Sequence, residues 1–260
     1  MSILDNIEGL KFTPETIEKY ILQKLEENKD FLFNELDLQM FVARSLKKEF
    51  SDNYKIHLEY HLPKGWNKKF DEDYSRWGTE IPYIDIILEK EGENSEFIAI
   101  ELKYKLKKIQ DKDLMRFGTK PERGDIVLVT NQSAQNNARY DFWKDVKRIE
   151  LLTKHFDKVI GGIAMLVTND ESYKTTKEGS NYSAFGLAST PKKGNLEWKD
   201  KGKIVGGKGK KTYMDPLTKK ISSLYVRPNF ELEKEYTGKW YKEGFTGPMD
   251  EKFYCYSVII

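Results

Sequence analysis

The chain has 260 residues, of which 33% are charged, but acidic and basic residues nearly balance to a net charge of +2, so any basic surface must be local. The single cysteine, Cys255, excludes an intrachain disulfide and is typical of a reducing compartment. The first residues show no signal peptide and no apolar run approaches the roughly 18 residues of a membrane helix, so we expect a soluble, cytoplasmic protein without a membrane partner.

Two amphipathic helices are predicted before the first strand. Thr13 and Pro14 form an N-cap and first-turn pair, which starts a helix that extends to about residue 30. A second helix is expected over residues 31–50, where apolar residues recur at helical spacing. Glu35 borders the apolar face of this second helix, a position at which a glutamate is usually a rim residue.

Three strands and one long loop follow these helices. Residues 55–62 alternate between apolar and polar side chains, which predicts the first strand of a sheet. Residues 63–80 are expected to form a polar loop, whose aromatic side chains either stack on bases or fold back onto the core, the second being slightly favoured. Residues 81–89 and 96–105 are apolar and β-branched, and the short polar segment between them is typical of a hairpin.

The predicted hairpin carries charged side chains within its apolar strands. Period-two geometry puts Glu101 and Lys103 side by side, about 7 Å apart along the strand, and antiparallel pairing can bring Asp85 to the same place. Carboxylates inside apolar strands are costly to bury without partners, and a divalent cation is a partner suited to carboxylate oxygens. The alternative is an edge strand with a solvated polar face.

This arrangement resembles the PD-(D/E)xK nuclease superfamily, which has the restriction-endonuclease-like fold. Pro82 and Asp85 correspond to its PD element, with two residues between them, and Glu101 and Lys103 match its E-x-K element. The superfamily also carries a glutamate on the helix before the sheet, and Glu35 is in the right place. The two other E-x-K triplets of the chain do not follow an aspartate-bearing strand.

The resemblance covers about residues 30–170 and implies an α/β fold with a restriction-endonuclease-like mixed central sheet flanked by helices. It implies that Asp85, Glu101 and Glu35 serve as metal ligands for Mg²⁺, for which Mn²⁺ would substitute. Lys103 would orient the attacking water or stabilise the transition state. The implied activity is that of a Mg²⁺-dependent endonuclease on DNA, in restriction, repair or phage defence, with a 5′-phosphate product.

A short strand is predicted at residues 126–130, followed by a helix whose firm part lies in the second half of residues 131–152. Gln135 and Arg139 lie in the amide-rich first half. Many superfamily members carry a polar residue, often glutamine, on the helix after E-x-K, near the metal site. The resemblance therefore makes Gln135 a candidate catalytic residue and Arg139 a candidate contact to nucleic acid. Amides that cap the start of a helix are an equally good interpretation.

The second half of the chain predicts a buried strand, a loop and a basic segment. Residues 158–168 are the most apolar run and are typical of a central strand, and residues 169–183 are expected to form a mobile polar loop. Residues 191–220 contain ten lysines and three acidic residues, interrupted by glycines, which predicts a basic hairpin or flap that binds phosphates without reading sequence. Its candidate contacts are Lys203, Lys208, Lys210 and Lys211.

Residues 252–260 predict a last strand that returns to the sheet, so the chain is expected to be a single nuclease-like domain. Within it, a basic, β-rich insertion or C-terminal extension covers about residues 184–250. DNA is the expected partner, and a homodimer is left open. A non-catalytic module that binds nucleic acid or protein on the same fold is the alternative function, because a fold alone does not decide activity.

Overall fold

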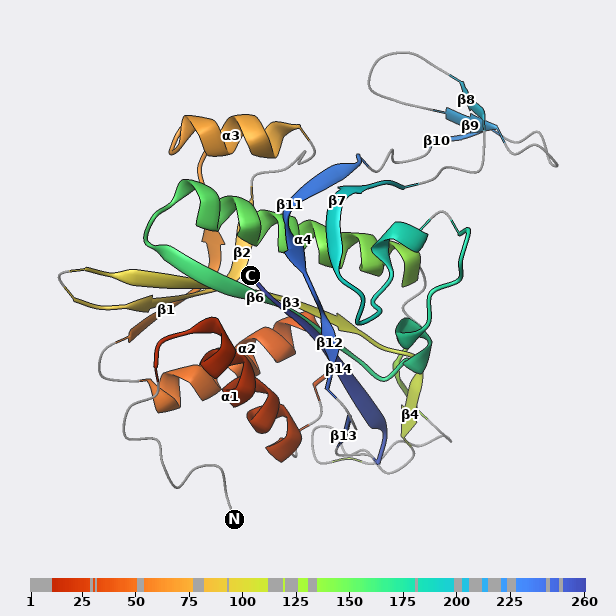
Figure 1. Ribbon diagram of the computed structural model, residues 1–260. Coiled ribbons are helices and arrows are strands. Elements are labelled where there is room, and N and C mark those ends of the chain that lie inside the picture. The colour runs from red at the N-terminus through yellow and green to blue at the C-terminus, as the bar shows by residue number, and fades with distance from the viewer. Residues whose placement is uncertain are drawn as a thin grey trace.

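The computed structural model describes residues 11–28, 30, 32–50, 54–76, 82–92, 94–111, 119, 126–130, 135–180, 182–198, 203–205, 212–214, 221–223, 228–241, 244–247 and 250–260. These residues form a mixed α/β structure in which a central sheet is flanked by helices on both faces (Figure 1). The α/β class and the mixed sheet expected from the sequence are therefore confirmed.

The central sheet has the strand order β1-β2-β3-β6-β14-β12, with β13 paired to β14 beside it. Its strands are β1 (Tyr54–His61), β2 (Tyr83–Lys90), β3 (Glu96–Lys105), β6 (Val159–Thr168), β12 (Lys239–Trp240), β13 (Phe245–Thr246) and β14 (Lys252–Ile259). Strands β3 and β6 are parallel, and all other neighbours are antiparallel. The predicted hairpin, the buried central strand and the returning last strand are all confirmed.

Helices α1 (Pro14–Glu27) and α2 (Glu35–Glu49) cover one face of the sheet, and α3 (Lys68–Ser75) and α4 (Gln135–His155) cover the other (Figure 1). The side chain of Thr13 accepts from the backbone N–H of Thr16, which confirms the predicted N-cap of α1. Helix α2 begins four residues later than predicted, because the side chain of Asn34 caps it by accepting from Asp37 N. None of the described helices is long and apolar enough to cross a membrane.

Strand β3 separates two apolar layers because its side chains alternate between the faces of the sheet. Ile98, Ile100 and Leu102 pack with α1 and α2 in one layer, whereas Ala99 packs with α4 in the other. The pleat places Glu101 on the same side as Ala99, next to α4. The spacing of apolar residues on β3 thus directs the E-x-K side chains toward the helix that follows in the chain.

The predicted loop at residues 63–80 contains helix α3, so the expectation of a segment without structure was wrong. Asn67 caps α3 by accepting from the backbone N–H groups of Lys69 and Phe70, both at 3.1 Å. Phe70 and Tyr74 are buried, as the favoured interpretation of this aromatic segment predicted.

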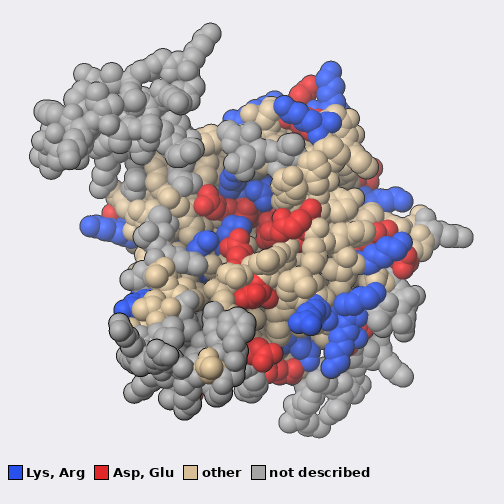
Figure 2. Space-filling model, turned by 180° about the vertical axis from the view of Figure 1, so that it is seen from behind, with Lys and Arg blue, Asp and Glu red and all other residues tan. Residues whose placement is uncertain are grey.

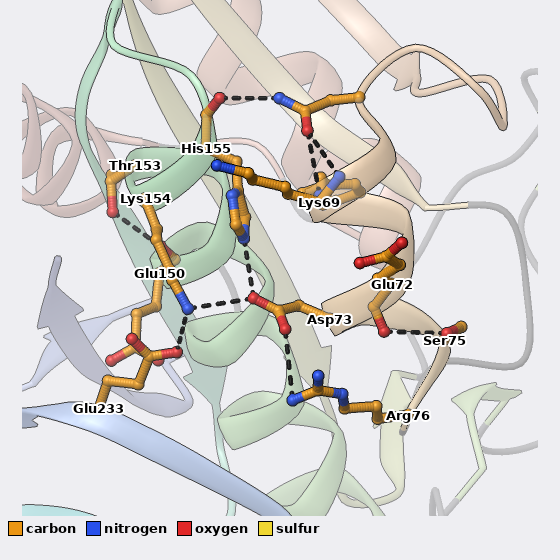
Figure 3. A network of polar contacts seen from close by, with 12 residues as sticks. Lys69, Glu72, Asp73, Ser75, Arg76, Glu150, Thr153, Lys154, His155 and Glu233 are labelled. Atoms are coloured by element: carbon orange, nitrogen blue, oxygen red, sulfur yellow. Dashed lines mark hydrogen bonds and ion pairs between the residues drawn. The ribbon is translucent and has the colours of Figure 1, made fainter.

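Polar contacts hold α3 against the end of α4 (Figure 3). The carboxylate of Asp73 lies 3.0 Å from Lys154 Nζ and 2.9 Å from His155 Nε2. Lys154 also lies 2.8 Å from Glu233 on β11 (Phe230–Tyr236), so one set of contacts joins three elements. Asn67 adds a hydrogen bond from its amide to the carbonyl of His155 at 3.0 Å.

The segment expected as a polar loop at residues 169–183 contains local structure, and its predicted mobility stays a prediction. It includes the 3-10 helix η2 (Glu171–Lys174) and leads into η3 (Ser183–Phe185). Asp170 and Tyr173 are buried within it. Three of its carbonyl groups accept hydrogen bonds from a side chain of α4, as described below.

The C-terminal part is rich in short strands, as expected. Strand β7 (Lys192–Leu196) pairs with β11 beside α4 (Figure 1). Earlier in the chain, before α4, β4 (Ile109–Asp111) pairs with β5 (Ile126–Val129). Strands β8 (Lys203–Val205), β9 (Thr212–Met214) and β10 (Ile221–Ser223) form a separate three-stranded sheet, with β8 and β9 antiparallel as in a hairpin. The division into one domain with an inserted basic region stays a prediction.

Cys255 on β14 provides a test of the sheet core. The residue is 1% exposed, and burial raises the pKa of its thiol. Because the thiolate is the reactive form, an aromatic disulfide reagent should label the native protein at least about a hundredfold more slowly than the protein in concentrated urea. Stoichiometric labelling of the native protein at the rate of an exposed thiol would contradict this packing.

Candidate active site

Strands β2 and β3 diverge partway along their length. Their pairing ends at Ile86 and Ile100, although β2 still pairs with β1 up to Tyr83 and β3 with β6 up to Lys105. Backbone groups at the diverging ends therefore have no partner on the neighbouring strand. Such groups are costly to bury unless other atoms hydrogen-bond to them.

Side chains supply the missing partners where the strands diverge. The carboxylate of Asp85 accepts from Leu102 N at 2.6 Å, and that of Glu35 at the start of α2 accepts from Tyr104 N at 3.0 Å. The amide of Gln39 donates to the backbone carbonyl of Asp85 at 2.6 Å. The divergence of the strands thus fixes both predicted carboxylates, Asp85 and Glu35, against β3.

Lys103 lies among carboxylates from four elements. Its ammonium is 3.0 Å from Asp145 Oδ2 on α4 and 3.6 Å from Glu35 Oε1. Burial alone would lower the pKa of Lys103, but the charges of these two groups and of Asp85 and Glu101 outweigh it and raise the pKa above its ordinary value. The lysine is therefore protonated at neutral pH and acts as a donor and a positive charge.

Glu101 is the most enclosed of the carboxylates, with 2% of its surface exposed. The guanidinium of Arg148 donates directly to Glu101 Oε1 and also lies 3.2 Å from Asp145 Oδ1 and from the carbonyl oxygen of Tyr83. Burial raises the pKa of Glu101 well above its ordinary value, and attraction to Arg148 opposes this shift. Burial likewise raises the pKa of Asp85 to about 6, with Lys103 opposing it.

The cluster holds more acidic than basic groups. Its four carboxylates are Glu35, Asp85, Glu101 and Asp145, and two cations, Lys103 and Arg148, lie among them. Lys105 on β3 adds a partly exposed ammonium 3.6 Å from Glu35. Four carboxylates against three cations leave a deficit of positive charge, which a bound cation or proton would offset.

The cluster also contains polar atoms without hydrogen bonds. Asp145 Oδ2 and Arg148 Nε are buried and make no hydrogen bond to the described residues, although Lys103 forms an ion pair with the former. Asp85, Glu35 and Lys103 are half-buried rather than enclosed, so the cluster reaches the surface. No group of three or more histidine, cysteine, aspartate or glutamate side chains among the described residues has the arrangement of a complete metal site. A cation here would depend on water or substrate oxygens for its remaining ligands.

Gln135 lies elsewhere, at the first residue of α4. Its amide donates to the carboxylate of Asp170 and, at 2.8 Å, to Ser172 Oγ, and Lys107 lies 2.9 Å from the same carboxylate. Ten residues of helix, or about 15 Å, separate Gln135 from Asp145. The structure thus places Gln135 apart from the carboxylates that it was expected to join.

Arg139 is 2% exposed, which contradicts its predicted contact with nucleic acid. Its guanidinium donates to the carbonyl oxygens of Ser172, Tyr173 and Thr175, each at 2.9 Å. These three bonds hold the turn after β6 onto α4. A buried side chain with this set of partners stabilises the fold and is not available to a phosphate on the surface.

Two charged residues of α4, Asp145 and Arg148, belong to the cluster but were not identified from the sequence. They are three residues apart, so they share one side of the helix, next to its apolar positions Val146 and Ile149. This pair of opposite charges beside an apolar stripe was the available signal. Gln39, whose amide donates to the carbonyl of Asp85, was also not identified from the sequence.

The predicted basic contacts are not placed by the structure. Lys208, Lys210 and Lys211 lie outside the described residues, as does the side chain of Lys203 on β8. Figure 2 shows acidic and basic side chains interspersed over the described surface of the rear face. The basic segment therefore stays a sequence-based prediction.

The chain matches no protein-family model, no curated protein and no solved structure.

The ion pair of Glu101 with Arg148 can be tested by unfolding in urea. Replacing Arg148 with methionine leaves Glu101 buried without its charged partner, so Arg148→Met should lower the free energy of unfolding by about 3–5 kcal/mol. The matched control is Arg76→Met, whose side chain is 76% exposed and lies 3.4 Å from Asp73. This control should lower stability by no more than about 1 kcal/mol.

Adding Glu101→Gln to Arg148→Met should recover part of the lost stability, because the uncompensated charge is removed. If Arg148→Met and its control Arg76→Met both lowered the free energy of unfolding by the same small amount, the enclosed ion pair would be contradicted.

Proposed function

We propose that the chain is a metal-dependent phosphodiesterase that cleaves nucleic acid, with DNA as the expected substrate, on a restriction-endonuclease-like variant of the α/β fold. The observation that supports this proposal most directly is the meeting of Asp85, Glu101 and Lys103, with Glu35 from α2, where β2 and β3 diverge. These are the residues that match the PD-(D/E)xK pattern in the sequence.

Asp85 and Glu101 are the side chains that would hold Mg²⁺, or Mn²⁺ in its place. Both offer the carboxylate oxygens that hard cations prefer, and the half-buried position of Asp85 leaves room for water and phosphate oxygens. Glu35 would assist from the rim of the cluster. A divalent cation supplies Lewis-acid chemistry at such a site, since it lowers the pKa of water and withdraws charge from a phosphate.

Lys103 would act as a hydrogen-bond donor rather than as a base, because neighbouring carboxylates keep it protonated. In this role its ammonium orients the attacking water or balances the charge that develops on the phosphate. The oxygen of water would form a bond to phosphorus and release a proton to solvent, while the bond to the leaving oxygen breaks and that oxygen takes up a proton from solvent. The resemblance to the nuclease superfamily implies a 5′-phosphate product, so the leaving oxygen would be the 3′ oxygen.

Arg148 would be a positioning residue. It contacts Glu101 and not the reacting atoms, and it shares its guanidinium with Asp145 and the backbone of Tyr83. A cation held by Glu101 would share that carboxylate with Arg148. This competition favours weak metal binding, strengthened by the phosphate oxygens of a bound substrate.

A second candidate function is a module on the same fold that binds nucleic acid or protein without cleaving it. The favouring observation is that Glu101 and Asp145 already have cationic partners, as expected of a structural ion-pair network. Affinity for DNA that falls steeply with salt, without turnover in Mg²⁺ or Mn²⁺, would identify this function.

Cleavage of supercoiled plasmid tests the enzyme directly. In Mg²⁺ the native chain should nick the plasmid, and a chelator should abolish nicking. Asp85→Asn should reduce the rate at least about a hundredfold, because it removes a carboxylate that would hold the cation. The control is Glu178→Gln, which alters an exposed carboxylate and should leave the rate unchanged.

Lys103→Met should lower the rate to a similar extent, whereas Lys55→Met, at a lysine of β1 that is 57% exposed and outside the cluster, should retain it. Nicking that survives Asp85→Asn at the native rate would exclude this cluster as the active site.

A further inference from the structure

A pocket of about 500 Å³ lies on the α4 side of the sheet, between β1–β3 and the end of α4, and the known motifs do not account for it. Four aromatic side chains line it, and none of them is fully buried: Tyr60, Trp66, Phe97 and Phe156. His61 and Lys158 add polar groups that can donate hydrogen bonds. Mostly apolar walls with a few polar groups are typical of ligand sites of this size.

Trp66 is 69% exposed, although its loop is held in place. The backbone N–H of Trp66 donates to the carbonyl of Pro63 at 3.3 Å, and that of Gly65 donates to the carboxylate of Asp71 at 2.6 Å. Gly65 adopts a φ of 89°, which other residues rarely adopt, so the turn suits glycine. A well-positioned indole that remains in water is suited to stacking on a ligand.

Two elements, β2 and α4, run from the pocket to the acidic cluster. Ile84, which lines the pocket, is adjacent to Asp85 on β2. Leu152, also in its lining, follows Arg148 by one turn of α4, or about 6 Å. Nucleotides follow each other at about 3.4 Å in a stacked strand and further apart when unstacked. A base in the pocket is therefore within one or two nucleotides of a phosphate at the cluster.

We propose that this pocket takes an unpaired nucleobase of the strand whose phosphate lies at the acidic cluster, with Trp66 stacking on the base. The proposal rests on the proposed phosphodiesterase function for its choice of ligand. Aromatic side chains stack on any base, so this contact favours single-stranded or locally opened substrates without reading their sequence. His61 and Lys158 in the lining can donate hydrogen bonds to the edge of the base or to the adjoining phosphate.

The test compares two oligomers with the same backbone charge. Fluorescein-labelled dT12 and a twelve-residue abasic oligomer are titrated with the full chain in chelator, which prevents metal-dependent cleavage, and binding is followed by anisotropy. We expect the native chain to bind dT12 at least about fivefold more tightly than the abasic oligomer, and Trp66→Ala to remove this preference. Trp66→Phe should retain most of it. Met40→Ala, which changes an exposed apolar residue on the other face of the sheet, is the matched control.

Equal binding of the two oligomers, or a preference that survives Trp66→Ala, would overturn the proposal. An apolar dye that binds in a Trp66-dependent way while dT12 shows no preference would also overturn it, by assigning the pocket to another ligand. Plasmid nicking separates this outcome from the parent function. If the native chain nicks plasmid but Trp66→Ala leaves oligomer binding unchanged, only the base-pocket proposal fails. If Trp66→Ala abolishes the preference for dT12 but the native chain does not nick plasmid, only the phosphodiesterase proposal fails.

Discussion

The arrangement of the site depends on the point where β2 and β3 stop pairing. A sheet that splits leaves backbone groups without ladder partners, and burial makes each of them costly. Asp85 and Glu35 accept from the N–H groups of Leu102 and Tyr104, and Gln39 donates to the carbonyl of Asp85. The same carboxylates thus stabilise the split and face Lys103, so the stability of the sheet and the geometry of the cluster have one origin.

Charge within the cluster is balanced locally but not completely. Asp145 and Arg148 from α4 form ion pairs with Lys103 and Glu101, and the surrounding carboxylates keep the half-buried Lys103 protonated. Four carboxylates nevertheless face three cations, and Asp145 Oδ2 lacks a hydrogen bond to the described residues. An enclosed ion-pair network with a remaining negative charge and an opening to solvent suits a cation that arrives with its substrate.

The local patterns that could be predicted are those determined by neighbours in sequence. Alternation placed Glu101 and Lys103 on one face of β3, and the hairpin brought Asp85 beside them. Asp145 and Arg148 were missed because only the crossing of α4 over β3 shows which side of that helix meets Glu101. Gln135 was expected at the carboxylates from its position after E-x-K, but it lies at the start of a long helix that reaches the cluster about three turns later.

A crystal of the chain soaked in Mn²⁺, measured for anomalous scattering, tests the cation site most directly. The expected result is an anomalous peak between the carboxylates of Asp85 and Glu101, with Lys103 facing it and no comparable peak in crystals of Asp85→Asn. A map in which the Arg148–Glu101 pair is unchanged and manganese binds only elsewhere would contradict the proposed site.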